Sequence, residues 1–391
     1  MYGTVASANE EDTSDPSRYI TLTIGSTYMT VNGKSQLIDG KGSTPFIEEN
    51  RTLVPLQAIF EAFSIELHRD NNVITGKHGD VEIKLTIGSA VAYKNSVPID
   101  MGVAPKIVKD CVMIPLRFIA ESLGAEVIWI PGTQTIHINH KPLFVELGDV
   151  CIYVGDSLSK VESLLGSPNR IDPSHCNFDW HVYNSDYSRF LMVGIRNGYV
   201  KALYTNSRGF VTNNAKYGDD YDSIVDKANI ELYYESTVGN TVYAVMIVSA
   251  DTRYRYSFDE KFFRAQEVQN FDIVNAFRVS NGFSVLTVDS VAALTAREHS
   301  QDMADKGYFS HRSPNGTTSV SRYYKNGGKH GLIHENIAAG YVLGIDTFDV
   351  WANSVDHRNV MLVASHKYAG VGYGYNPDSA FGYYMTQLFC S

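Results

Sequence analysis

The segment from Ala296 to Asn359 carries three short motifs rich in polar residues. They are Phe309-Ser310-His311, His334-Glu335-Asn336-Ile337-Ala338 and Trp351-Ala352-Asn353-Ser354-Val355-Asp356-His357-Arg358-Asn359. His311, Glu335 and His357 are 24 and 22 residues apart, so they cannot meet on one helix. Only a folded domain can bring them together, and such convergence is what a functional site requires. We therefore predict a C-terminal domain with a cleft formed by these three residues.

Six motifs follow one another in a recognisable order: Asn275-Ala276-Phe277-Arg278, Asp302-Met303-Ala304, Phe309-Ser310-His311, Glu335-Asn336-Ile337-Ala338, His357-Arg358-Asn359 and Tyr384-Met385-Thr386-Gln387-Leu388-Phe389. This order resembles the bacterial branch of the CAP superfamily (cysteine-rich secretory proteins, antigen 5 and pathogenesis-related 1), also called SCP domains. The resemblance implies an α-β-α sandwich over residues 270–391. It also implies an extracellular protein, secreted or associated with the cell wall, without fixing one reaction.

The resemblance implies a cleft of two histidines and two glutamates, as in animal CAP proteins. His311 matches the first histidine, Glu335 the first glutamate and His357 the second histidine, whereas Ser354 stands at the second glutamate. Two imidazoles and one carboxylate suffice to bind a divalent ion, zinc foremost, with water at the open position. Without the second carboxylate we expect the metal to be held more weakly.

Five neighbours are expected to support the cleft. Ser354 could donate a hydrogen bond to an imidazole. His334 and Asp356 stand where the family usually has glycine, and they either add ligand capacity or are solvated, because adjacent residues of a strand face opposite sides. Asn336 and Gln387 are expected to hydrogen-bond the scaffold. The alternative is that His311, Glu335 and His357 only bond one another to seal a small domain.

The sequence contains none of several motifs that mark known catalytic or nucleotide-binding sites. There is no H-E-x-x-H, no G-x-S-x-G and no G-x-x-x-x-G-K-S/T, and Gly372-Tyr373-Gly374 lies between predicted strands rather than before a helix. One hypothesis is a binding module that takes a protein, peptide, wall or lipid ligand. The other is a hydrolase acting on peptides or the wall, with His311, Glu335 and His357 as catalytic residues. The missing second glutamate and the lack of an obvious nucleophile favour binding.

Residues 19–140 contain an internal repeat. Leu22-Thr23-Ile24-Gly25-Ser26 recurs as Leu85-Thr86-Ile87-Gly88-Ser89, and the segment 53–63 recurs as 113–123, at offsets of 63 and 60 residues. The repeat resembles the copper amine oxidase N-terminal-like, or stalk, domain of exported Gram-positive proteins. We expect no copper, because the repeat has no histidines with ligand spacing. A role as a spacer or envelope-docking module is favoured.

Residues 145–262 form a second block, in which Leu165-Gly166-Ser167-Pro168-Asn169-Arg170 and Trp180-His181-Val182-Tyr183 resemble the CAP-associated domain. A helix is predicted from Leu158, capped by Asp156 or Ser157 and ended by Gly166. In the third block, a helix is predicted from Asp289 or Ser290 to Lys306, with His299 on its apolar face as a core residue. The whole chain is thus predicted to be α+β and multidomain, with two smaller domains before the sandwich.

Composition excludes some partners. The 391 residues are 44% hydrophobic and 19% charged, as in a folded protein, and the net charge is -10 without a lysine or arginine cluster. Nucleic acid is therefore not expected as a partner. No run of about 18 apolar residues occurs, so we expect no membrane span.

The N-terminus and the cysteines bear on export. Residues 1–18 are predicted to be the disordered remnant of an export signal or a linker, because Ala6 and Ala8 form an A-x-A cleavage pattern. Four cysteines, Cys111, Cys151, Cys176 and Cys390, are too few for a disulfide framework. Cys151 and Cys176 could pair, and four free thiols are equally consistent with the spacing.

Overall fold

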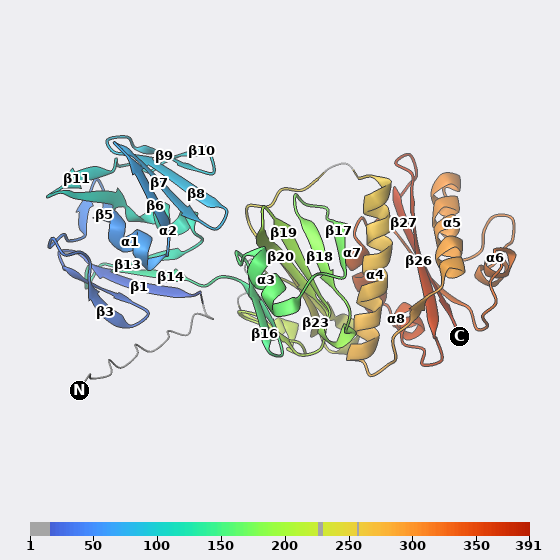
Figure 1. The fold of residues 1–391 in the computed structure, drawn as a ribbon. Helices are drawn as coiled ribbons and strands as arrows, with labels where there is room; N and C mark the ends of the chain where they lie inside the picture. Colours follow the sequence, from blue (N-terminus) through green and yellow to red (C-terminus); the bar gives the residue numbers. More distant parts are fainter. Residues whose placement is uncertain (1–15, 226–229, 256–257) are drawn as a thin grey trace, which may run out of the picture. The chain divides into compact units, whose positions relative to one another are not determined.

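Figure 1 shows the computed structural model of the chain, which describes residues 16–225, 230–255 and 258–391. The chain divides into two compact units, Met1–Pro142 and Leu143–Ser391. The export-signal remnant predicted over residues 1–18 falls almost entirely outside the described residues. None of the helices in the described ranges is both long and apolar enough to cross a bilayer.

The first unit is built of short antiparallel strands and two short helices. These elements are β1 (Arg18–Thr23), β2 (Tyr28–Val31), β3 (Lys34–Leu37), β4 (Phe46–Glu48), β5 (Arg51–Pro55), α1 (Leu56–Ala62), β6 (Glu66–Asp70), β7 (Val73–His78), β8 (Val81–Thr86), β9 (Val91–Lys94), β10 (Val97–Asp100), β11 (Lys106–Val108), β12 (Cys111–Pro115), α2 (Leu116–Ser122), β13 (Glu126–Ile130) and β14 (Thr135–His140). The strands form three sheets, ordered β13-β14-β1-β2-β3, β10-β9-β8-β7-β6 and β11-β12-β5-β4.

The predicted repeat is visible in this topology. β5 and β12 pair antiparallel at the centre of the four-stranded sheet, and each leads through a proline, Pro55 or Pro115, into its helix. α1 and α2 then bury Ile59 and Ile119 at equivalent positions in one core. The two halves therefore share one backbone plan, and they can be compared position by position.

The second unit opens with a predominantly antiparallel β region. Its elements are β15 (Phe144–Leu147), β16 (Val150–Tyr153), α3 (Leu158–Leu165), β17 (Arg170–Pro173), β18 (Asp179–Tyr183), η1 (Tyr187–Arg189), β19 (Leu191–Arg196), β20 (Tyr199–Thr205), β21 (Phe210–Val211), η2 (Tyr221–Ser223), β22 (Ile230–Glu235), η3 (Ser236–Val238) and β23 (Thr241–Val248). The main sheet has the order β17-β18-β19-β20-β23-β22. α3 begins at a cap in which Ser157 accepts from the Lys160 amide, and it ends at Gly166, as predicted.

One long helix, α4 (Glu260–Ser280), lies between this sheet and the C-terminal one (Figure 1). Of its 21 residues, 16 are buried, because it is covered on both faces. Asp272 of α4 accepts hydrogen bonds from Arg170 at 2.8 Å, Asn184 at 2.8 Å and Tyr187 at 2.7 Å. The boundary predicted between residues 262 and 270 thus falls inside a continuous helix, and both predicted domains belong to one compact unit.

The C-terminal part is the α-β-α sandwich that the family resemblance implied. It contains β24 (Thr287–Val288), α5 (Ser290–Lys306), α6 (Ser319–Lys325), β25 (His334–Ala339), α7 (Gly344–Ala352), α8 (Val355–Met361), β26 (Tyr368–Tyr375) and β27 (Tyr383–Cys390). The sheet order is β24-β26-β27-β25. Figure 1 shows α4 and α7 on one side of this sheet and α5 on the other.

A stripe of glycines explains how closely α5 lies on β26. Gly370, Gly372 and Gly374 alternate along the strand, and a Cβ atom added at Gly372 would lie 1.9 Å from the backbone nitrogen of Arg297. Only hydrogen at these positions lets the backbone of the helix touch the backbone of the strand. The motif noted between predicted strands therefore lies inside a strand and serves packing.

The cysteines are all free in this structure. Cys176 and Cys390 are buried, and Cys111 and Cys151 are partly buried. Burial raises the pKa of the Cys176 thiol to about 11. A disulfide between Cys151 and Cys176, one of the two possibilities left by their spacing, is not formed.

Candidate functional site

The structure joins two of the three predicted site residues directly. His311 lies in the loop that leaves α5 after Gly307, which ends that helix in the left-handed conformation with φ of 66°. Its Nδ1 is 2.9 Å from Oε1 of Glu335 on β25. The His311 side chain is 56% exposed, whereas that of Glu335 is 3% exposed. An exposed imidazole is thus held by a buried carboxylate.

Arg322 on α6 completes this arrangement, and the sequence analysis did not identify it. Its Nη2 donates to Oε2 of Glu335 at 2.6 Å, and its side chain is 11% exposed. Its Nη1 donates to the carbonyl oxygens of His311 at 3.1 Å and Thr317 at 3.3 Å and to the Ser313 hydroxyl at 3.2 Å. One guanidinium therefore fixes both the carboxylate and the loop that carries His311.

His299 of α5 lies under the same group. It is 1% exposed, as expected for a core residue, yet its Nε2 is 3.9 Å from Oε1 of Glu335 and 3.1 Å from the Ser310 carbonyl oxygen. Burial lowers the pKa of His299 to about 4, against the opposing effect of Glu335. We infer that His299 is neutral at physiological pH and supports the loop from below.

His357, the third predicted residue, lies on α8. Burial lowers its pKa, and the charge of His311 lowers it further. Its Nδ1 is buried without a hydrogen-bond partner in the described part of the chain. His357 therefore interacts with His311 through charge, and its buried Nδ1 is an unpaired polar atom of this region.

The predicted supporting residues divide into two kinds. Asn336 donates to the His357 carbonyl oxygen at 3.1 Å and to Gln387 Oε1 at 3.2 Å, so both amides bond the scaffold. His334 faces away from Glu335, because its Nδ1 lies 3.0 Å from His366 Nε2. Ser354 precedes α8 without a side-chain capping bond, and Asp356 is exposed in the first turn of α8.

Exposed aromatic side chains lie close to His311 in the chain. Phe309, two residues before it, is 46% exposed, and its ring centroid is 6.0 Å from that of Phe381, which is 49% exposed. A hollow of about 160 Å³ is lined by His299 and Arg322, among others, and the Nε of Arg322 has no hydrogen-bond partner within the described residues. Phe309 and Phe381 thus form an exposed apolar pair, and the hollow at Arg322 holds a buried donor.

The predicted metal does not fit the residues as they are placed. Nowhere in residues 16–225, 230–255 and 258–391 do three or more His, Cys, Asp or Glu side chains form a group that could hold a metal ion. Both oxygens of Glu335 are already engaged, and Arg322 brings a positive charge to the position that a cation would need. A zinc site stays a prediction from the family resemblance alone.

Comparison with known families assigns each part of the chain to a class. Residues 271–389 match the cysteine-rich secretory protein family, residues 154–268 the CAP-associated N-terminal domain and residues 38–138 the copper amine oxidase N-terminal domain. The C-terminal part of the chain, residues 271–389, is therefore a domain that matches the CAP family. All three resemblances seen in the sequence are confirmed.

Two proteins of Bacillus subtilis are similar in sequence. The chain is 25% identical over 273 residues to the uncharacterized membrane protein YlbC, a match that covers 56% of this chain and 79% of that protein. It is 34% identical over 109 residues to the uncharacterized protein YkwD, which covers 28% of this chain and 42% of that protein. Neither name states an activity.

One solved structure supports the fold. An extracellular protein containing an SCP domain from Bacillus anthracis superposes with a TM-score of 0.52 at 22% identity, over 61% of this chain and 93% of that one. A cysteine-rich secretory protein from Staphylococcus aureus covers the same shares with a TM-score of 0.48 and 13% identity. The first likeness confirms the α+β fold of the second unit.

Proposed function

We propose that this chain is an extracellular binding protein of the cell envelope, whose CAP domain presents His311 as its recognition residue. One observation carries the proposal. Glu335 is buried with both oxygens engaged, one by His311 and one by Arg322, so it is built to hold an imidazole in place. A side chain fixed in this way loses little conformational entropy when a ligand binds.

The surface around His311 suits a ligand with both polar and apolar parts. The exposed rings of Phe309 and Phe381 supply apolar area, and aromatic residues are enriched at the energetic centres of interfaces. His311 supplies a hydrogen-bonding group on the exposed side. This combination fits an envelope protein or a wall peptide better than a purely apolar lipid.

Extracellular localisation is part of the same proposal. The B. anthracis protein of similar fold is described as extracellular, and no helix within the described residues could span a bilayer. YlbC is named a membrane protein, and a position at the outer face of the membrane or in the wall is compatible with both descriptions.

Sedimentation with purified Gram-positive cell walls tests the proposal. The full chain should be depleted from the supernatant, and His311→Ala should weaken this binding at least about tenfold, because a hydrogen bond from a fixed charged or polar group is lost. His68→Ala, which removes an exposed imidazole from β6, is the matched control and should bind as the wild type does. Equal binding by His311→Ala would contradict the proposal.

A second candidate function is supported by the geometry of the same pair. In the tautomer that donates Nδ1–H to Glu335, His311 keeps Nε2 on its exposed side, which is how a carboxylate orients an imidazole for general-base catalysis. Release of soluble fragments from the same cell walls would show hydrolase activity. The hydrolase is favoured if Glu335→Gln abolishes this release while wall binding is retained.

A further inference from the structure

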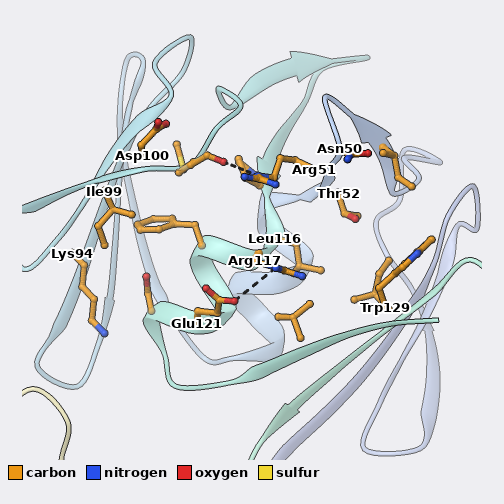
Figure 2. A pocket seen from close by; sticks show the side chains of 17 residues that line it. Asn50, Arg51, Thr52, Lys94, Ile99, Asp100, Leu116, Arg117, Glu121 and Trp129 are labelled. Atoms are coloured by element: carbon orange, nitrogen blue, oxygen red, sulfur yellow. Dashed lines mark hydrogen bonds and ion pairs between the residues drawn. The ribbon is translucent and has the colours of Figure 1, made fainter. Parts of the chain in front are cut away.

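Another hollow lies in the first unit, and none of the predicted site residues lines it. It has a volume of about 580 Å³ and is lined by β4, β5, β10, α2 and β13. Figure 2 shows Trp129 on one side of the hollow and Ile99 on the other, with Arg51 and Arg117 between them. Apolar residues such as Leu116 form its inner wall, and charged residues stand at its rim.

The internal repeat provides a comparison for this hollow, because each lining residue has an equivalent in the other half. At an offset of 60 residues, Arg69 stands in place of Trp129, and each lies opposite an isoleucine of the next strand, Ile74 or Ile136. Arg69 is exposed on β6, whereas Trp129 is partly buried. The two halves share one backbone, so the aromatic wall is not a requirement of the fold.

At two further positions, the side chain that lines the hollow is larger than its equivalent in the other half. Phe118 of α2 corresponds to Ala58 of α1, and Arg117 corresponds to Gln57. Arg117 pairs with Glu121 at 3.7 Å, and both side chains are more than half exposed, at 61% and 58%. An ion pair this exposed contributes little, so the guanidinium can exchange its partner for a carboxylate of a ligand.

Arg51 has no counterpart in the other half, where Cys111 stands at its position. Its Nε donates to the Met101 carbonyl oxygen at 3.3 Å, and a Cβ atom added at Gly102 would lie 3.1 Å from that nitrogen. Gly102 has a φ of +78°, so glycine is also favoured by the backbone there. At the same offset of 60, Gly102 corresponds to Gly42, whose φ is +74°, so this turn is common to both halves and only the arginine differs.

The strands around the hollow indicate the kind of ligand. β4, β10 and β13 are each the edge strand of a different sheet in the described part of the unit, so their outer backbone groups are available for pairing. An extended peptide can use such edges through its main chain and place alternate side chains in a pocket, which a sugar polymer cannot do.

We propose that this hollow binds an extended peptide in which a large apolar side chain is followed by a carboxylate. The apolar side chain lies against Trp129 and Leu116, and the carboxylate bonds Arg117 and Arg51. The first unit is then a peptide-recognition domain, in which both halves of the duplication contribute to one binding surface and the equivalent surface on the other side keeps only the scaffold.

A randomised library of eight-residue peptides on beads, sorted with the fluorescently labelled full chain, tests the proposal. Enriched peptides should carry Leu, Ile or Phe next to Asp or Glu. The Kd of the most enriched peptide, measured by fluorescence polarisation, should rise at least tenfold in Arg117→Gln and in Trp129→Arg. Both variants adopt residues that the other half carries at the same backbone positions, and thermal unfolding checks that they fold.

Gln57→Ala, in the other half, is the matched control and should bind that peptide within twofold of the wild type. Sorting with the double variant that carries Arg117→Gln and Trp129→Arg should give no enrichment. The proposal is overturned if the double variant enriches the same peptides or if no peptide is enriched at all. Binding of penta-N-acetylglucosamine that the double variant loses, without peptide enrichment, would instead assign the hollow to a glycan.

Discussion

Arg322 Nη2 and Glu335 Oε2 are 2.6 Å apart in the C-terminal domain, and both side chains are withdrawn from solvent, at 11% and 3% exposure. The pair is separated by 13 residues, and it joins α6 to β25 beneath the exposed His311. A buried charge whose partner is removed is strongly destabilising, because no water replaces the lost bond. The pair therefore makes the local fold depend on a residue outside the predicted site.

Arg322→Met should lower the free energy of unfolding by about 3–5 kcal/mol, since it leaves the Glu335 carboxylate buried with one oxygen unpaired. Urea unfolding measures this change. Arg312→Met is the matched control: its guanidinium donates to the exposed Gly316 carbonyl oxygen, and the cost should stay within about 0.5 kcal/mol. Adding Glu335→Gln to Arg322→Met should recover part of the loss, and no recovery would argue against the buried-charge explanation.

Gly372→Ala tests the contact between β26 and α5. The added Cβ atom would lie 1.9 Å from the Arg297 nitrogen and 2.3 Å from the Ala296 carbonyl carbon, so the helix must move. Overpacking of this kind should cost about 3 kcal/mol or more, read as a fall in the urea midpoint. Gly331→Ala adds the same atom where nothing lies within 4 Å, and it should be nearly neutral.

Acid should destabilise the second unit through two buried histidines. Burial lowers the pKa of both His299 and His366 to about 4, so the unfolded chain takes up protons first as the pH falls from 6.5. Their contribution to stability is complete above pH 6.5 and is lost toward pH 4. Asp346 has the opposite effect, because burial beside Glu231 raises its pKa to about 6.

The contribution of His299 can be isolated by substitution. The wild type loses unfolding free energy between pH 7 and pH 4.5, and His299→Gln should make this loss smaller by about 2 kcal/mol. The measurement is urea unfolding at a series of pH values. A slope identical to that of the wild type would show that His299 is not neutralised by burial.

Most of the fold was predictable because its signals are local. The cap of α3 at Ser157, its end at Gly166 and the start of α5 after Asp289 all depend on residues within one turn, and the structure has each where the sequence placed it. His334 and Glu335 are adjacent on β25 and face opposite sides, as alternation along a strand requires. The order of the family motifs then predicted the α-β-α sandwich of the C-terminal domain.

The parts that sequence reasoning missed depend on distant contacts. The domain boundary predicted between residues 262 and 270 falls inside α4, because a helix covered by sheets on both faces loses the polar stripe that marks a single amphipathic helix. Arg322 lies on a seven-residue helix with no motif of its own, and its role follows only from where β25 passes. The hollow at Trp129 likewise exists only when edge strands of three sheets come together.

The three tryptophans fall one to each predicted domain, and they make the cooperativity of the chain measurable. Trp180 and Trp351 are both fully buried members of one hydrophobic core, to which the CAP-associated sheet, α4 and the CAP sheet all contribute. Trp129 packs instead against a core whose residues all lie between Ile20 and Ile138. Residues that share a core lose it together.

In urea, the ¹⁹F resonances of Trp180 and Trp351 in the 5-fluorotryptophan-labelled chain should therefore disappear at one common midpoint. The Trp129 resonance should follow a midpoint of its own. Asp272→Ala removes the acceptor shared by Arg170, Asn184 and Tyr187, and it should lower the first two midpoints equally while leaving that of Trp129 unchanged. A Trp180 signal that is lost well before that of Trp351 would mean that the CAP-associated region and the CAP domain fold as separate units in spite of the helix they share.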